Sequence, residues 1–131
     1  MSYLPPFDVI KEKFRVVGGL GRARIDMKQS DFVDLLKLML RAVDVKEEWY
    51  LAHYPDVAEA IKAGAYKSGK HHFVEEGYFE GRVPYEFAVD EQWYKSNYPD
   101  IAVGMQSGTL GSPKEHFLAH GYKEGRLPAE Y

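Results

Sequence analysis

Apolar and charged positions near the start of the chain follow the two-residue period of a β-strand. Three apolar residues alternate with three charged ones in the order Arg22, Ala23, Arg24, Ile25, Asp26 and Met27. This alternation predicts a half-buried strand. An earlier apolar run, residues 14–17, is followed by Gly18-Gly19, which suits a two-residue hairpin turn because both positions tolerate positive φ. We therefore predict a β-hairpin at about 12–28.

Residues 1–29 as a whole are predicted to be an extended leader followed by this hairpin, because Pro5-Pro6 disfavours helix. The segment Gly18-Gly19-Leu20-Gly21 fits neither common phosphate-loop spacing, and a second strand follows it rather than a helix. An isolated hairpin is marginal in water. We therefore expect it to lie on a helix or to pair with the same hairpin of a second chain.

The period then changes to that of an amphipathic helix, predicted over residues 30–44. One face of this helix is apolar and comprises Phe32, Leu35, Leu36, Met39, Leu40 and Val43. The opposite face carries Asp34, Lys37 and Arg41. Ser30 is expected to cap the helix, with Asp31 in its first turn.

From Val45 onward the chain repeats itself after a shift of 44 residues. Residues 45–87 overlay residues 89–131 without a gap, and 20 of the 43 aligned positions are identical. Self-similarity of this length indicates a duplicated structural unit. The two repeats are residues 45–88 and 89–131.

Each repeat is predicted to contain three short helices. In the first copy these cover about 45–53, about 55–63, and a third helix that begins after Ser68 and ends at Gly77. Pro favours the first helical position, Ser the cap and Gly the end of a helix. Such short helices need partners, so we expect the repeats and the helix at 30–44 to share one core. The predicted fold is mainly α in a single domain over 1–131, with two tandem three-helix repeats, a packing helix and a small N-terminal β-hairpin.

The motif shared by both copies is Trp-Tyr-x3-Tyr-Pro-Asp-[Val/Ile]-Ala, followed by His-Phe-x3-Gly-Tyr-x-Glu-Gly-Arg-x-Pro. It resembles a short tandem helical repeat of bacterial polysaccharide-related, glycosyltransferase-linked and surface proteins. The resemblance covers residues 43–131, and residues 1–42 resemble nothing recognised. It implies a helical repeat and a role near envelope or polysaccharide production. It transfers no catalytic residue to this chain.

Composition and charge narrow the class of protein only slightly. The chain has 131 residues, a net charge of −3 and no cysteine, so thiolate metal sites are excluded. Residues 1–29 carry six basic and three acidic side chains, but a solvated strand face explains this better than nucleic-acid binding. No apolar run approaches the roughly 20 residues that span a bilayer, and no secretory signal is present. We expect a cytoplasmic protein.

Two polar pairs recur in register and are predicted to hold each repeat together. Asp56 and Arg82 in the first copy correspond to Asp100 and Arg126 in the second. We expect each arginine to reach the carboxylate and loop carbonyls at the start of the second helix, although a bond between repeats is an alternative. His72 and His116 are expected to be structural as well, with each imidazole bonded to a nearby backbone group.

Metal and catalytic interpretations stay as alternatives. His116 and His120 have the i, i+4 spacing of zinc ligands, but the first copy has Glu76 in place of the second histidine. Glu80 and Glu124 occupy the same place in both copies, which favours a turn element over an asymmetric acid–base pair. We expect no cofactor and no bound metal, and we do not expect an enzyme. A small metal-dependent enzyme remains an alternative.

The surplus of aromatic residues is the main indication of function. The chain contains ten tyrosines, and the hydroxyls of so many cannot all be satisfied inside a small core. Exposed tyrosines favour recognition surfaces. The candidate binding residues are Tyr50, Tyr66, Tyr78, Tyr94 and Tyr122. We expect a non-catalytic adaptor that binds a protein partner and self-associates, with carbohydrate binding through exposed Tyr and Trp as the alternative.

Overall fold

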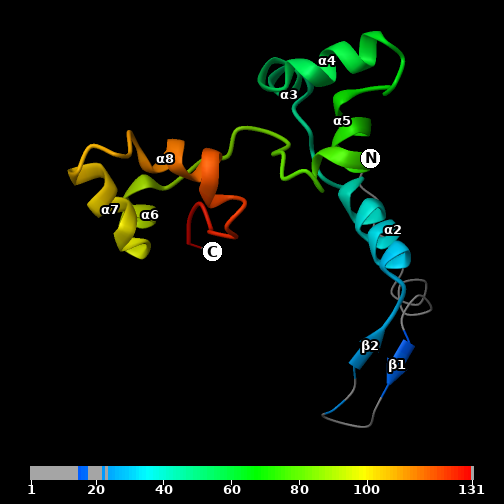
Figure 1. Ribbon diagram of the computed structural model, residues 1–131, viewed down its shortest axis with the longest axis horizontal. Helices are drawn as coiled ribbons and strands as arrows, with labels where there is room; N and C mark the ends of the chain where they lie inside the picture. The colour runs from blue at the N-terminus through cyan, green and yellow to red at the C-terminus, as the bar shows by residue number, and fades with distance from the viewer. Residues whose placement is uncertain (1–14, 18–21, 23, 131) are drawn as a thin grey trace. The chain divides into compact units, whose positions relative to one another are not determined.

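The chain is mainly helical in the computed structural model, which describes residues 15–17, 22 and 24–130 (Figure 1). The described residues contain two short strands, seven α-helices and two π-helical turns. The chain divides into two compact units, Met1–Pro84 and Tyr85–Tyr131. The first unit contains the first repeat up to Pro84, the second unit contains residues 85–88 and the second repeat, and each unit has its own cluster of buried side chains. The single core expected from the sequence stays a prediction.

The strands β1 (Arg15–Val17) and β2 (Arg24–Asp26) pair antiparallel, with Val17 opposite Arg24. Six residues therefore separate the strands. The predicted two-residue turn at Gly18-Gly19 is wrong, because it would place Val17 opposite Leu20. The hairpin over 12–28 is thus not found in its predicted form. Residues 1–14, 18–21 and 23, with most of the predicted leader and turn, lie outside the described residues.

The expectation of a half-buried strand is also wrong for β2. All three of its residues are exposed, and Ile25 retains 60% of its accessible surface. The only strand paired with β2 in the described structure is β1. A two-stranded ribbon buries a face only when another layer packs on it. Ile25, the apolar residue of β2, therefore remains accessible among the described residues.

The helix α2 (Gln29–Leu40) is shorter than predicted and begins one residue earlier. Lys28, not Ser30, occupies the N-cap position, so the predicted Ser30 cap is wrong. The helix ends in a 3₁₀ turn. The backbone N–H groups of Ala42 and Val43 donate to the carbonyls three residues earlier, those of Met39 and Leu40, at 3.0 Å each. Its predicted apolar face is only partly covered. Leu35 and Leu40 are buried, whereas 47% of Phe32 and 45% of Met39 are exposed.

The two repeats contain the same elements in the same order, as the sequence predicts. The first comprises α3 (Glu47–His53), α4 (Pro55–Lys62), α5 (Gly69–His72) and the π-helical turn η1 (Phe73–Gly77). The second comprises α6 (Glu91–Asn97), α7 (Pro99–Gln106), α8 (Pro113–His116) and η2 (Phe117–Gly121). Within each repeat the first helix contacts the other two: α3 contacts α4 and α5, and α6 contacts α7 and α8 (Figure 1).

The predicted helix boundaries of the repeats are confirmed by their local chemistry. Pro55 begins α4, and Gly64 ends it with φ of 81°. The next residue, Ala65, donates to the carbonyl of Ala60 at 2.9 Å, which completes a Schellman cap. The Ser68 hydroxyl accepts a bond from the backbone N–H of His71 at the start of α5. The corresponding residues of the second repeat behave in the same way.

The third helix of each repeat is not α-helical throughout, which the sequence analysis did not anticipate. In η1 the N–H of Tyr78 donates to the carbonyl of Phe73 at 2.9 Å, five residues earlier. Single π-helical turns inside helices often occur at functional sites. Here the wider turn brings Gly77 against the side chains of α3. The same bond joins Tyr122 to Phe117 in η2.

The chain enters and leaves each repeat at the same place. The N–H of Lys46 donates to the carbonyl of Pro84 at 3.1 Å, and the N–H of Asp90 donates to the carbonyl of Pro128 at 3.0 Å. The Tyr54 hydroxyl adds a second tie, because it accepts a bond of 3.0 Å from the N–H of Val83. Each repeat is therefore a closed structural unit.

Candidate functional site

The core of each repeat contains a buried tyrosine–histidine pair. The Tyr50 hydroxyl is hydrogen-bonded to Nδ1 of His72 at 2.9 Å, and Tyr94 and His116 form the same bond at 2.9 Å. The predicted backbone partner for these histidines is therefore wrong, because each imidazole bonds to a tyrosine hydroxyl. Burial lowers the pKa of His72 and raises the pKa of Tyr50. Neutral His72 is thus a structural group of the fold.

The paired arginine and aspartate lie on the surface of each repeat. Arg82 donates from Nη1 and Nη2 to both carboxylate oxygens of Asp56, at 2.9 and 2.7 Å. Its Nε donates to Glu80 at 2.7 Å rather than to a loop carbonyl, and its guanidinium lies 4.9 Å from the centre of the Tyr54 ring. Asp100 and Arg126 form the same fork in the second repeat. The bonds lie within each repeat, not between repeats.

The turn that places Arg82 depends on a glycine. Gly81 has φ of 78°, and Arg82 donates its backbone N–H to the carbonyl of Gly77 at 2.8 Å. The positive φ reverses the chain after η1, so that the arginine side chain reaches back to the start of α4. A hydrogen bond from Arg82 is the main reason that the pKa of Asp56 is lowered. The carboxylate therefore stays ionised at neutral pH.

The candidate binding tyrosines fall into two groups. Tyr50 and Tyr94 have no exposed surface, so the expectation that they contact a ligand is wrong. They are buried because their hydroxyls have partners inside the core. Tyr66 and Tyr122 are partly exposed, and 36% of Tyr78 is exposed, next to the Phe79 ring at 5.3 Å. A binding role for Tyr66, Tyr78 and Tyr122 stays a prediction.

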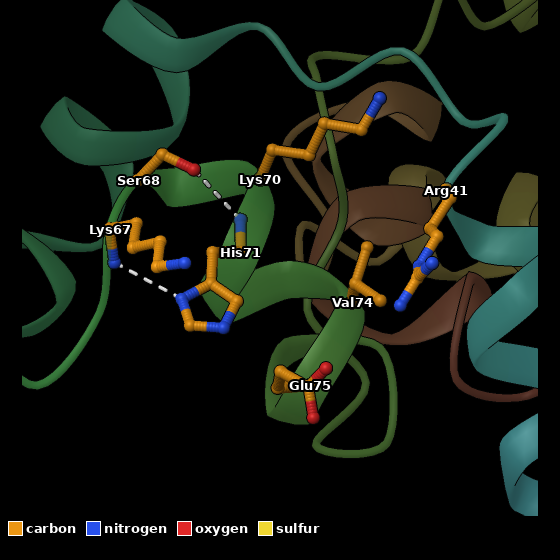
Figure 2. Close-up of a pocket in the computed structure, with 7 residues that line it drawn as sticks. All are labelled: Arg41, Lys67, Ser68, Lys70, His71, Val74 and Glu75. Atoms are coloured by element: carbon orange, nitrogen blue, oxygen red, sulfur yellow. Dashed lines mark hydrogen bonds between the residues drawn. The ribbon is translucent and has the colours of Figure 1, made fainter. Parts of the chain in front are cut away.

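A pocket of about 400 Å³ in the first unit is lined mostly by polar and charged side chains (Figure 2). Arg41 follows α2, Lys67 and Ser68 precede α5, and α5 itself contributes Lys70 and His71. Val74 and Glu75 of η1 complete the lining. We call this the basic pocket. It brings two segments that are distant in sequence to one concave surface.

Two hydrogen bonds, drawn in Figure 2, hold the backbone turn at the start of α5 that lines the basic pocket. The backbone N–H of Lys67 donates to Nδ1 of His71 at 3.1 Å, which fixes the imidazole. The N–H of His71 donates in turn to the Ser68 hydroxyl at 3.0 Å. The basic side chains therefore extend from a defined backbone turn.

The charge of the basic pocket is positive. Its single carboxylate, Glu75, forms an ion pair of 2.8 Å with Lys37. That hydrogen bond from Lys37 is the main cause of the lowered pKa of Glu75, and His71 and Arg41 contribute to it. Glu47 also lies close by, but its two carboxylate oxygens accept the N–H groups of Gly69 and Lys70. Among the residues that the structure describes, no carboxylate forms an ion pair with Arg41, Lys67 or Lys70, so these side chains can bind an anionic group.

The second repeat is an internal comparison for the basic pocket. The counterpart of Lys67 is Gly111, and the counterpart of His71 is Glu115, whose carboxylate lies against Gly111. The counterpart of Lys70 is Lys114, which pairs with Glu86 at 2.7 Å. The repeat therefore folds in the same way without the basic side chains. Their presence in the first copy is not required by the fold.

The sequence analysis missed the basic pocket. A local signal existed, because residues 67–72 read Lys-Ser-Gly-Lys-His-His in a part of the chain that is otherwise acidic. The contribution of Arg41 could not be seen, since it follows α2 and is more than 25 residues away in sequence. His116 and His120, the pair named as an alternative metal site, have ring centres 5.7 Å apart, and in the described part of the chain they belong to no cluster of three ligand groups.

None of the protein-family models, curated proteins or solved structures compared with this chain matches it. The resemblance to a bacterial helical repeat therefore stays a prediction. Among the described residues, every helix is too short or too polar to cross a membrane.

Proposed function

We propose that this chain is a non-catalytic interaction module whose first repeat binds an acidic segment of a partner protein. The observation that supports the proposal is the basic pocket, whose Lys67 and His71 are replaced by Gly111 and Glu115 in the second repeat. Residues common to both copies, such as Tyr50 and Arg82, have structural bonds in both. Lys67 and His71 are replaced by Gly111 and Glu115 in the second copy, which keeps the same fold, so their basic side chains are the ones best suited to recognition.

The chemistry of the pocket favours carboxylate or phosphate groups on an extended segment. Arg41 supplies a planar fork that binds an oxyanion through two bonds, while Lys67 and Lys70 supply point charges. Most of these side chains are at least partly exposed, so the electrostatic attraction is sensitive to salt. Such a site suits a transient adaptor contact. The expected link to envelope or polysaccharide production rests on the sequence resemblance alone.

The direct test is a fluorescence-polarisation titration with a labelled peptide in which glutamate alternates with glycine. We expect binding that weakens between 50 and about 300 mM salt. The variant Lys67→Gly/His71→Glu introduces the residues of the second repeat and should weaken binding by about tenfold or more, the equivalent of about 1.4 kcal/mol. Equal binding by the wild type and this variant would contradict the proposal.

The matched control is Lys123→Glu, which changes the net charge by the same amount at an exposed position of the second repeat. It should bind the peptide as the wild type does. A neutral oligosaccharide titrated in parallel tests the alternative of carbohydrate binding. Binding of the sugar that is lost on Tyr78→Ala, and unaffected by Lys67→Gly/His71→Glu, would favour that alternative.

Self-association also stays a prediction. The side chains that would support it are the exposed apolar groups of β2 and α2, namely Ile25, Phe32 and Met39. Light scattering on the purified chain measures it directly. A mass of one chain at all concentrations would contradict the expectation.

A further inference from the structure

Three potential metal ligands converge on the first repeat, outside the basic pocket. His72 ends α5, Glu76 belongs to η1, and Glu80 follows η1. One ligand atom of each lies within 4.8 Å of the other two. Ligand atoms bound tetrahedrally to one ion at about 2.0–2.3 Å lie about 3.3–3.8 Å from one another, which is inside this limit. His72 is buried at this place, while the two carboxylates are exposed.

Each of these three groups is oriented by a partner of its own. Nδ1 of His72 is bonded to the Tyr50 hydroxyl, which leaves Nε2 as the ring nitrogen available to a ligand. The Glu76 carboxylate raises the pKa of Tyr66, so the two side chains lie close together, and the Tyr66 ring packs edge-on against His72 at 4.8 Å. Outer-shell partners of this kind hold metal ligands in place and are typical of metal sites.

Arg82 orients the Glu80 carboxylate but bonds to only one of its two oxygens. Its Nε donates to Oε2 of Glu80, so Oε1 has no bond from that guanidinium. The remaining donors of Arg82 go to Asp56, whose charge offsets the arginine. The three ligand groups together therefore present one neutral nitrogen and two negative carboxylates to a cation.

We propose that His72, Glu76 and Glu80 form a binding site for a first-row divalent cation of the zinc class. One imidazole and two carboxylates are a donor set that such ions accept, with water completing the coordination. The site lies next to the basic pocket in sequence but shares no residue with it. The inference is independent of the proposed binding of an acidic partner.

The second repeat provides a matched control. The corresponding residues are His116, His120 and Glu124, a set that by composition alone is the better zinc site. Within the described residues, however, only His72, Glu76 and Glu80 form a cluster that could hold an ion. Leu110 replaces Tyr66, so the tyrosine that lies beside His72 and Glu76 has no equivalent. The geometry therefore places the metal site in the first repeat, whereas composition alone would place it in the second.

The test is calorimetric titration of the full chain with ZnCl2 after treatment with a chelator. We expect one ion per chain. Glu76→Gln removes an exposed ligand and should weaken binding by at least about tenfold, with Tyr66→Phe weakening it by a comparable factor. His120→Gln should leave the affinity unchanged. Circular dichroism verifies that each variant is folded.

Three results would overturn the inference. The wild type could take up no zinc, Glu76→Gln could bind as tightly as the wild type, or His120→Gln could lose the ion instead. The last result would place the site in the second repeat. Titration with Co²⁺ gives an independent spectroscopic readout, because visible absorption bands from the bound ion should weaken in Glu76→Gln and persist in His120→Gln.

Discussion

The hydroxyl of Tyr50 and Nδ1 of His72 lie 2.9 Å apart in the core of the first repeat, in a space that Gly77 leaves open. A Cβ atom at Gly77 would collide with that hydroxyl. Gly121 stands in the same relation to Tyr94 in the second repeat. The glycine that ends each third helix is therefore also needed for the close approach of the hydroxyl.

Gly77→Ala is expected to lower the free energy of unfolding by about 1–3 kcal/mol, the usual cost of overpacking a core. Urea denaturation measures this. Gly111→Ala is the control, because its new Cβ would meet only the carboxylate end of Glu115, an exposed side chain that can move. Its effect should stay within about 0.5 kcal/mol. Equal losses in the two variants would refute the close-approach explanation.

Arg82→Ala is expected to destabilise the first repeat by about 1–2 kcal/mol, since it removes a two-bond ion pair and the contact with the Tyr54 ring. Arg82→Lys keeps the charge but loses the planar fork, so its loss should be about half as large. Lys62→Ala removes an exposed ion pair with Glu59 of 3.4 Å and should have almost no effect. Melting temperatures of the three variants measure these losses of stability. An unchanged value for both Arg82 variants would mean that the fork has no structural role.

The effect of Arg82→Ala should depend on pH in the acid range. Hydrogen bonds from Arg82 and Arg126 lower the pKa of Asp56 and Asp100 from the usual 3.8. A carboxylate with a lowered pKa stabilises the fold above its unfolded-state value, and this contribution is lost as the pH falls through the folded-state value. The difference in stability between the wild type and Arg82→Ala should therefore be constant above pH 5 and shrink below about 3.8. Urea titrations across this range test it, and a difference that persists at pH 2.5 would be inconsistent with the ion pair.

The buried histidines predict a second pH dependence, closer to neutrality. Burial lowers the pKa of His72 and His116 from 6.5, with smaller effects of Arg82 and Arg126 in the same direction. The unfolded chain then binds more protons than the folded one. The contribution of the neutral histidines to the free energy of unfolding is therefore fully present above pH 6.5 and declines as the pH falls below it. The variant His72→Gln/His116→Gln should show a flatter profile between pH 7.5 and 5.5. A parallel decline in the wild type and the variant would assign the effect to other groups.

The sequence predicts the elements of the repeats well because their boundaries depend on local chemistry. Pro55, Gly64 and Ser68 act on backbone groups within a few residues, and the structure confirms each of them. The partner of His72 could not be inferred in the same way, since Tyr50 lies 22 residues away and meets it only after folding. The π-helical turn η1, which directly follows His72, has no distinctive sequence pattern.

The errors near the N-terminus have a different physical origin. Alternation in β2 predicts that one strand face is covered, but periodicity does not reveal what would cover it. The same applies to Phe32 and Met39 on α2, which are apolar in the right register yet exposed. The basic pocket was missed because it needs Arg41 and Lys70 to meet, and only a folded first unit brings these side chains to one surface.

The bonds from Lys46 to Pro84 and from Asp90 to Pro128 hold the first and last residues of each repeat side by side. A segment whose two ends coincide can be spliced into a host protein, or copied again in tandem, without disturbing the interior of its neighbours. Gene duplication could therefore yield a second copy that folded at once. The two copies now differ at corresponding surface positions, with lysine at 67 and glycine at 111.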